Sequence, residues 1–156
     1  MTHEDYMRLA FEEASFGMRN NIGGPFGAII VHNGQIVGKG HNKVTSTNDP
    51  TAHAEVTAIR NACKNLNTFD LQSAILYSSC EPCPMCLSAI YWANIKTVFY
   101  CLDRNNAAEI GFSDKFIYDE LNIPMEDRTV KMKHLHLLNS SDLFNEWMTR
   151  PDKITY

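Results

Sequence analysis

The sequence predicts an α/β protein in which a mixed sheet lies between layers of helices, a three-layer α/β/α architecture. Segments with helical periodicity alternate with strand-like segments along the chain. One pair of strand-like segments is joined by Asn33-Gly34, a strong signal for a tight antiparallel hairpin. The length of 156 residues fits one domain, because domains commonly contain roughly 100 to 200 residues.

The N-terminal segment predicts an amphipathic helix followed by the hairpin. Thr2 and Asp5 have the spacing of a helix start signal, and apolar residues recur at helical spacing from Met7 to Met18. Residues 20–25, rich in Asn and Gly, end this helix. Strands are then expected at residues 26–32 and 35–40, on either side of the Asn-Gly turn.

The rest of the chain continues the alternation of helices and strands. After a polar loop over residues 42–49, Pro50 introduces a helix at about residues 52–65, and a second proline-initiated helix covers about 84–93. Strands are predicted at residues 74–77, 97–101 and 134–138, and further helices near 105–109, 114–121 and 142–149. No repeat, low-complexity tract or charge block marks a linker, so residues 1–156 are expected to form a single domain.

Composition and charge narrow the functional classes. The formal net charge of −4 disfavours binding to a nucleic-acid backbone, which depends on clustered Lys and Arg. Five cysteines are too few for a disulfide scaffold, and no apolar run approaches the roughly 20 residues that cross a bilayer. The N-terminus lacks the basic and apolar regions of a secretory signal. We therefore expect a cytoplasmic protein with reduced thiols and no membrane association, in which closely spaced cysteines bind metal or act in catalysis.

Four residues at two predicted helix starts carry the chemistry: His53, Glu55, Cys83 and Cys86. A helix N-terminus has unpaired backbone N–H groups and a positive dipole end, which favour thiolate and so favour zinc ligation. Cys83 and Cys86 are three residues apart and can face one point from a first helical turn. His53 and Glu55 converge only if His53 lies at the helix start, with the metal in front of it.

The number of ligands points to catalysis. One His and two Cys leave the fourth tetrahedral position for water, as in catalytic zinc sites, and Glu55 is then placed as general acid and base. The alternative is a closed Cys3His site in a zinc-stabilised interaction module, or part of an iron–sulfur ligand set, because Cys80 precedes Cys83 at the same spacing. Pro82 and Pro84 separate Cys80 from the helix turn, which favours the three-ligand site.

These motifs resemble the cytidine deaminase-like superfamily of zinc deaminases, whose signature is H-x-E…P-C-x-x-C. Within it the chain is similar to the bacterial guanine deaminases over nearly all of its length, including the C-terminal Tyr156. The segments that carry this likeness are GGPFGA at 23–28, NDPTAHAEV at 48–56, CEPCPMC at 80–86 and GFSD at 111–114. The resemblance implies the cytidine deaminase-like fold, a homodimer, and hydrolysis of guanine to xanthine and ammonia.

The same resemblance implies roles for individual residues. His53, Cys83 and Cys86 are expected to hold one Zn²⁺ per chain, and Glu55 to move protons between water, the ring nitrogen N3 and the departing amine. The backbone N–H at Ala54 is expected to steady developing charge.

Contacts with the purine base are expected from polar and aromatic residues. Asp114 suits the donor edge of guanine, Asn42 can read another edge, and Phe26 and Trp92 offer aromatic faces. Without the family likeness, ordinary structural roles such as helix cap, turn or core would be favoured for these side chains. The segment 150–156, which ends on Tyr156, is expected to close the active site of its own or a partner subunit.

Two other deaminase activities remain open. The tRNA adenosine deaminases share the metal motifs, but they require a basic face, and the C-terminal segment SDLFNEWM at 141–148 is not basic. A deaminase of guanosine, isocytosine or cytosine would need only a changed pocket.

Overall fold

The structure is a computed structural model that describes all residues from 1 to 156, and its centre is one mixed four-stranded sheet. The strand order is β2-β1-β3-β4. Strands β1 (Gly27–His32) and β2 (Gln35–His41) form an antiparallel hairpin, and β1 also pairs antiparallel with β3 (Ala74–Cys80). The edge strand β4 (Thr97–Leu102) runs parallel to β3. The predicted mixed sheet is confirmed.

The hairpin turn forms as predicted. Asn33 and Gly34 have φ angles of 50° and 75°, and two consecutive positive φ angles are what a type I′ turn requires. His32 and Gln35 pair directly across the turn. Further along the hairpin the register shifts between Ile30 and Val31, which marks a β-bulge.

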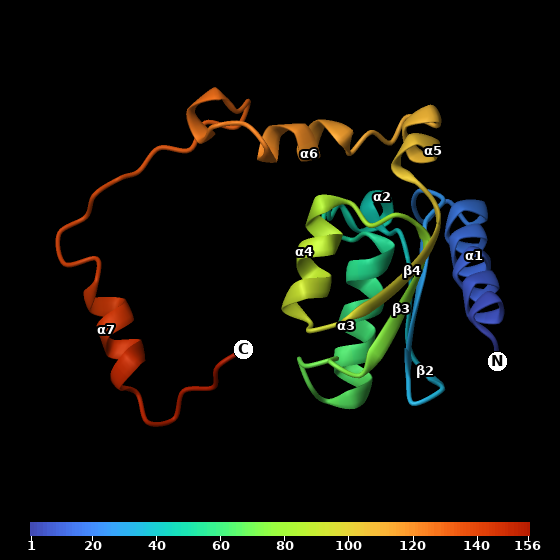
Figure 1. Ribbon diagram of the computed structural model, residues 1–156, viewed down its shortest axis with the longest axis horizontal. Helices are drawn as coiled ribbons and strands as arrows, with labels where there is room; N and C mark the ends of the chain where they lie inside the picture. Colours follow the sequence, from blue (N-terminus) through green and yellow to red (C-terminus); the bar gives the residue numbers. More distant parts are fainter.

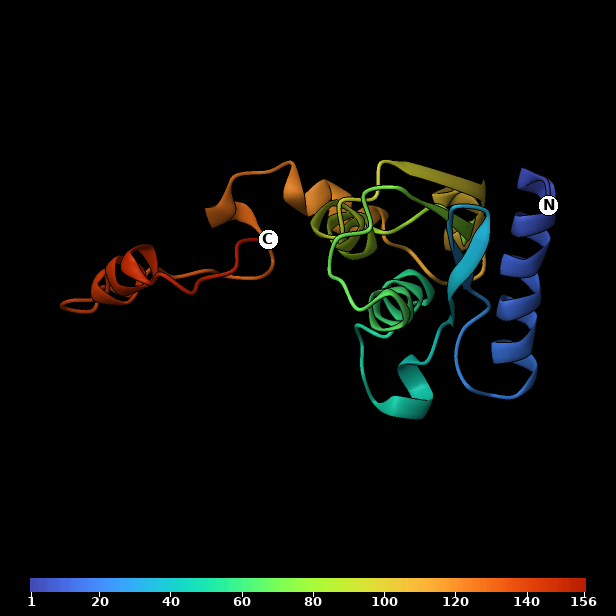
Figure 2. The same ribbon diagram turned by 90° about the horizontal axis from the view of Figure 1, so that it is seen from below.

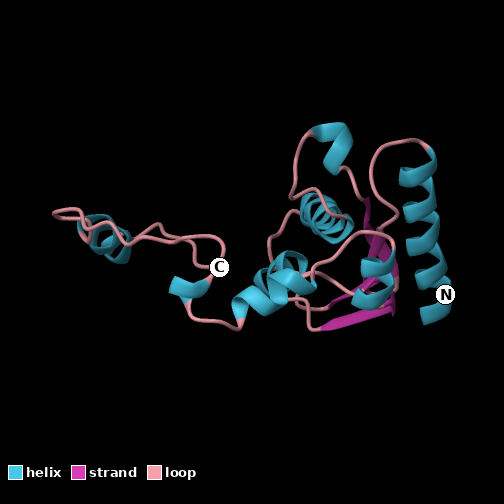
Figure 3. Ribbon diagram, turned by 90° about the horizontal axis from the view of Figure 1, so that it is seen from above, coloured by secondary structure: helices cyan, strands magenta, loops and turns pink.

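Helices cover both faces of the sheet, so the three-layer prediction is also confirmed (Figures 2 and 3). Helix α1 (His3–Arg19) lies on one face, and helices α3 (Ala54–Leu66) and α4 (Pro84–Trp92) lie on the other (Figure 2). The core on the α1 side consists of Tyr6, Ala10, Ile29, Val31 and Tyr77. The larger core on the other side consists of Ala28, Ile30, Ala54, Ala58, Ala62, Leu71, Ala74, Leu76, Ile90, Ala93 and Ile95.

The end of β2 approaches the start of α3 very closely. A Cβ atom added at Gly40 would lie 2.3 Å from the carbonyl oxygen of Ala54, so only glycine allows this contact. Just beyond the strand, the Lys43 N–H donates to the carbonyl of Ala52 over 2.9 Å. This packing brings the loop after β2 beside the segment that leads into α3.

Several element boundaries differ from the sequence prediction. A short helix α2 (Val44–Thr47) lies inside the predicted loop, and β3 continues to Cys80 instead of ending at residue 77. Helix α3 begins at Ala54 because His53 has extended backbone angles and occupies the N-cap position. Helices α5 (Arg104–Glu109) and α6 (Lys115–Leu121) lie close to the predicted ranges.

Residues 122–156, here called the arm, loop away from the compact body formed by residues 1–121 and turn back toward it at the C-terminal end (Figure 1). The arm contains a 3₁₀ turn η1 (Met125–Asp127), an extended stretch and helix α7 (Asp142–Thr149). The predicted strand at 134–138 is wrong for the isolated chain, because this stretch has no strand beside it to pair with. No residue of α7 is buried. None of the helices combines the length and apolar character that crossing a membrane requires.

Candidate active site

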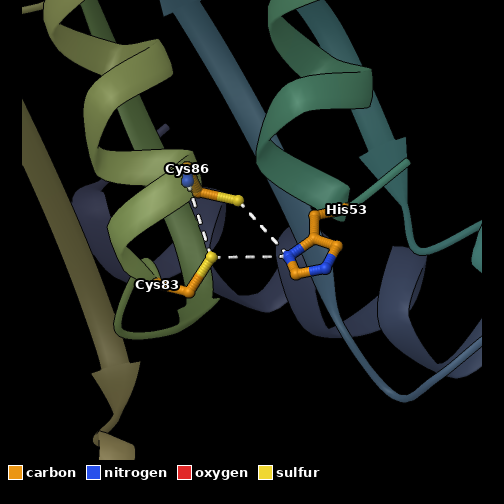
Figure 4. Close-up of side chains that lie close together, drawn as sticks. All are labelled: His53, Cys83 and Cys86. Carbon is orange, nitrogen blue, oxygen red and sulfur yellow. Dashed lines mark hydrogen bonds between the residues drawn. The ribbon is translucent and has the colours of Figure 1, made fainter. Parts of the chain in front are cut away.

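His53, Cys83 and Cys86 converge at one point, as the sequence predicts (Figure 4). The Nδ1 atom of His53 lies 3.6 Å from the Cys83 sulfur and 3.5 Å from the Cys86 sulfur. Two thiolates and one imidazole are a preferred donor set for zinc. With Zn–S of about 2.3 Å and Zn–N of about 2.0 Å, tetrahedral geometry requires N···S separations of about 3.5 Å. Both N···S separations therefore match those around a zinc ion, and three ligands leave one coordination position open.

Two helix starts hold these ligands. His53 is the N-cap of α3 and Cys83 the N-cap of α4, each with extended backbone angles. The Cys86 N–H donates to the Cys83 sulfur over 3.5 Å, and Pro84 occupies the first turn, where a missing N–H costs nothing. The expectation that His53 stands at the helix start is confirmed, and this position lets it face the same point as Glu55.

Protons are shared unevenly among the three ligands. Hydrogen bonds from the Cys86 thiol and the His53 ring hold the pKa of Cys83 well below its usual range. The contact with Cys83, together with burial, raises the pKa of Cys86. The same hydrogen bond to Cys83 raises the pKa of His53. Metal binding therefore has to displace protons from Cys86 and His53.

Cys80 does not join the ligand set. It is the last residue of β3, and its Sγ donates to the backbone carbonyl of Asp103 over 3.6 Å. Burial raises its pKa to about 11, so this side chain stays a thiol. The closed Cys3His site and the iron–sulfur alternative are therefore wrong, because the thiol of Cys80 points to the start of α5.

Glu55 is buried behind the ligands and is fixed by a partner that the sequence analysis missed. The Ser78 hydroxyl on β3 donates to Glu55 Oε1 over 3.0 Å. Burial raises the pKa of the Glu55 carboxyl. A raised pKa favours the protonated form, so this carboxyl can hold a proton closer to neutral pH than an exposed one. The only sequence signal for this role is the pair Ser78-Ser79 in an otherwise apolar buried strand.

The backbone N–H of Ala54 and the side chain of Asn42 provide free donors near the metal ligands. The N–H of Ala54 at the start of α3 makes no hydrogen bond within the protein. Asn42 is 6% exposed, and its Oδ1 accepts from the N–H groups of Gly24 and Val44. Both of these bonds use the side-chain oxygen, so the amide nitrogen of Asn42 remains available to donate to a ligand.

Asp114 has the one buried side-chain oxygen or nitrogen in the protein without a hydrogen-bond partner, its Oδ1. It occupies the N-cap position of α6, yet its side chain makes no capping hydrogen bond. Burial and the nearby Cys83 raise the pKa of Asp114. An unpaired buried acceptor is costly, so a donor from a bound ligand would satisfy it.

An aromatic pair lies beside the Asn42 loop. Phe26 is half-buried, and its ring meets that of Phe112 edge-on with centroids 4.9 Å apart. A Cβ atom at Gly24 would be 3.2 Å from the Phe112 ring, which places both rings next to the Gly24 segment. Phe112 is a second aromatic residue at this place that the sequence analysis did not single out.

Trp92 and Tyr156 lie away from the metal ligands of their own chain. Trp92 is 68% exposed and ends α4, the helix whose N-cap is Cys83. At 1.5 Å per residue, these two ends of α4 are separated by about 13 Å. The Tyr156 ring is 5.9 Å from Trp92 and 6.3 Å from Phe69. Within one chain, Trp92 and Tyr156 are therefore not brought to the metal ligands, and their part in a site stays a prediction.

Residues 1–102 match the family described as "Cytidine and deoxycytidylate deaminase zinc-binding region". The chain belongs to this deaminase family. Membership agrees with the cytidine deaminase-like arrangement of the sheet and helices and with the His/Cys/Cys site. The chain is thus a zinc-dependent aminohydrolase by fold, donor set and family.

Individual deaminases extend the match along the whole chain. A guanine deaminase of Bacillus subtilis is 51% identical over 156 residues, covering 100% of both proteins. The X-ray structure of a B. subtilis guanine deaminase superposes with a TM-score of 0.97, covering 100% of this chain and 99% of the other. A tRNA-specific adenosine deaminase of Aquifex aeolicus is 35% identical over 151 residues, covering 96% of each protein. The match to the B. subtilis structure includes the arm.

Proposed function

We propose that this deaminase hydrolyses guanine to xanthine and ammonia, with one zinc ion per chain bound by His53, Cys83 and Cys86. The observation that carries the proposal is the unpartnered carboxylate oxygen of Asp114. The charge of the nearby Cys83 contributes to the raised pKa of this carboxyl. Guanine has an N–H group at N1, which can donate a hydrogen bond to this oxygen. The 51% identity to the B. subtilis guanine deaminase supports the same substrate.

Zinc in an open three-ligand site supplies Lewis acidity and lowers the pKa of water to about 7, so that hydroxide is available at neutral pH. Glu55 takes one proton from the attacking water and donates it to N3 as C2 is attacked. It then moves the proton of the new C2 hydroxyl to the amine, and the C2–N bond breaks to release ammonia as the C2 carbonyl of xanthine forms. The raised pKa of Glu55 lets it carry a proton between these steps. The Ser78 hydroxyl holds one oxygen of Glu55, and the free N–H of Ala54 donates to the developing charge.

The base is held by the polar and aromatic groups around the metal ligands. Asp114 accepts from N1–H, and the free amide nitrogen of Asn42 donates to an acceptor on another edge of the ring. Phe26 and Phe112 supply an aromatic wall for the planar purine. A base that presents an acceptor in place of N1–H, as adenosine does, would face the Asp114 carboxylate with a lone pair and be disfavoured.

A substrate panel tests this proposal. Ammonia release should be measured with guanine, guanosine, cytosine, isocytosine, adenosine and an anticodon stem-loop RNA. We expect kcat/KM for guanine to exceed every other value by at least about 100-fold, because sites built to hydrogen-bond a substrate group strongly reject analogues that lack it. The proposal is wrong if any other substrate is turned over as efficiently as guanine.

The RNA substrate belongs in the panel because of the A. aeolicus relative, a tRNA-specific adenosine deaminase. Two features of this chain disfavour that activity. The net charge is −4, and α7 has the sequence DLFNEWMT, without a basic residue.

The functional unit proposed here is a homodimer in which the arm of each subunit packs on its partner. The arm exposes a series of apolar side chains, which is unfavourable in water. The most exposed are Leu135 (88%), Tyr156 (83%), Leu138 (81%), Phe144 (74%), Val130 (73%), Leu143 (70%) and Met148 (69%). A second copy of the chain is a suitable partner, because the body offers matching uncovered surfaces.

Two features of the body fit the two elements of the arm. The outer edge of β4 lacks a strand neighbour, so the stretch at 134–138 can pair there as a fifth strand. A groove of about 830 Å³ along α1 is lined by the apolar side chains Met7, Phe11, Phe16 and Cys101 together with six polar or charged ones, a mixture that suits an amphipathic helix such as α7. Within one chain, α1 and α7 lie on opposite sides of the body (Figure 1), which favours exchange between subunits.

Mixed dimers test this arrangement. The full chain should elute at twice the mass of one chain, and a chain ending at Asp127 should elute as a monomer. Neither a Glu55→Gln subunit nor a subunit lacking residues 150–156 should be active alone. When the two are refolded together, activity should recover. In the mixed dimer the truncated subunit keeps Glu55, and the intact C-terminal tail of the Glu55→Gln subunit closes its site. Absence of recovery, or a monomeric full chain, would contradict closure by the partner.

The five free cysteines support a cytoplasmic location, because two of them must stay reduced to bind zinc.

A further inference from the structure

Three segments around the metal site are joined by one stack of side chains, formed by Glu81, Arg104 and Tyr118. Arg104 donates from Nη2 to Glu81 Oε1 over 2.6 Å and from Nε to both carboxylate oxygens over 3.2 Å. Its backbone N–H adds a fourth bond, to Glu81 Oε2 over 3.1 Å. On its other side, the Arg104 guanidinium carbon lies 3.8 Å from the centroid of the Tyr118 ring. Such an arginine is held both by its charge and by stacking.

The stack ends on the loop that carries a metal ligand. The Tyr118 hydroxyl donates to the carbonyl of Pro82 over 2.9 Å, directly before Cys83. Glu81 precedes Pro82, so both ends of the stack reach the same loop. The stack thereby connects the metal loop, the start of α5 and the middle of α6.

Apart from hydrogen bonds that Arg128 and Thr129 donate to its C-terminal turn, helix α6 has little else to hold it. None of its residues is buried, and its apolar side chains Phe116, Ile117 and Leu121 are 55%, 44% and 56% exposed. Tyr118 follows Asp114 by four residues, and the Tyr118 N–H donates to the Asp114 carbonyl over 3.2 Å. Residues with this spacing lie on the same face of a helix. The bond that fixes Tyr118 therefore also fixes the direction in which Asp114 points.

We propose that Arg104 and Tyr118 are positioning residues for substrate recognition: they hold Asp114 against the metal loop at the distance that the guanine base requires. They touch neither the base nor the metal ligands' side chains. The inference rests on the proposed role of Asp114 in binding guanine. It follows that their substitution weakens guanine binding only as long as Asp114 is present.

A double-mutant cycle on guanine binding tests the proposal. Guanine Kd is measured by calorimetry on zinc-loaded protein in a Glu55→Gln background, in which turnover does not interfere. Tyr118→Phe keeps the stacking ring and loses only the hydroxyl, and Arg104→Lys keeps the charge but not the planar fork. We expect each to raise Kd about 5- to 10-fold, the scale of one lost hydrogen bond. Lys115→Met, which breaks the exposed ion pair with Asp119 on the same helix, should leave Kd unchanged.

The decisive comparison is made with Asp114→Asn present. There, Tyr118→Phe and Arg104→Lys should change Kd less than 2-fold, with zinc content the same in all variants. An undiminished effect in that background, a loss of zinc, or no effect of either substitution alone would overturn the positioning role. If Asp114→Asn by itself leaves guanine binding unchanged, the proposed recognition by Asp114 is wrong instead.

Discussion

Cys83→Ala is expected to lose its zinc and with it nearly all deaminase activity. Cys83 is one of the three proposed zinc ligands, and the Cys86 N–H also donates to its sulfur, so the substitution would remove a metal bond and an organising contact. Loss of an outer-shell partner typically lowers metal affinity by roughly 10- to 100-fold, and loss of a ligand should exceed that. Zinc content after dialysis and ammonia release from guanine measure the two effects.

Cys80→Ala is the matched control. It removes a thiol of the same chemistry three residues away, which donates to the Asp103 carbonyl and not to the metal site. This variant should keep full zinc content, with at most a modest loss of stability from the missing buried sulfur. The ligand assignment would be refuted by the opposite pattern, in which Cys80→Ala loses zinc and Cys83→Ala retains it.

Glu55→Gln is expected to lower kcat by about 10²- to 10⁴-fold while zinc stays bound, since general acid–base groups typically contribute that much. The amide has nearly the same size and can still accept from the Ser78 hydroxyl, but it cannot carry a proton. Steady-state kinetics with guanine and a zinc assay on the same sample separate loss of chemistry from loss of metal.

Ser78→Ala provides a graded comparison for Glu55. It keeps the carboxylate and removes only the hydrogen bond that orients it, so its kcat should fall between those of the wild type and Glu55→Gln. A Glu55→Gln enzyme with near wild-type kcat would show that another group moves the protons.

Local signals explain the parts of the molecule that the sequence predicted well. The Asn33-Gly34 turn and the start of α1 depend on residues within a few positions of each other, and both form as expected. The convergence of His53 with the two cysteines was also predictable, because each ligand stands at a helix start that nearby residues specify.

Features that depend on distant partners were missed or predicted incorrectly. The stretch at 134–138 has the residues of a strand, but a strand forms only where another strand can pair with it, and the arm of one chain meets none. The role of Ser78 depends on where β3 passes under α3. Asp114 has the position of a helix cap, yet only the surrounding structure shows that its side chain does not cap.

The bulge in the β1–β2 hairpin determines which face of the sheet each residue at the end of β2 points to. Ile36 packs on the α1 side, whereas both Val37 and Gly38 face α3, so two consecutive residues share one side at this point. Beyond the bulge the alternation is inverted, which turns Gly40 toward Ala54 and brings the chain after β2 to the segment that leads into α3. Without that one additional residue, β2 would direct the same side chains toward α1. The length of the hairpin is thus itself a determinant of the active site, even though its turn lies at the opposite end of the strands.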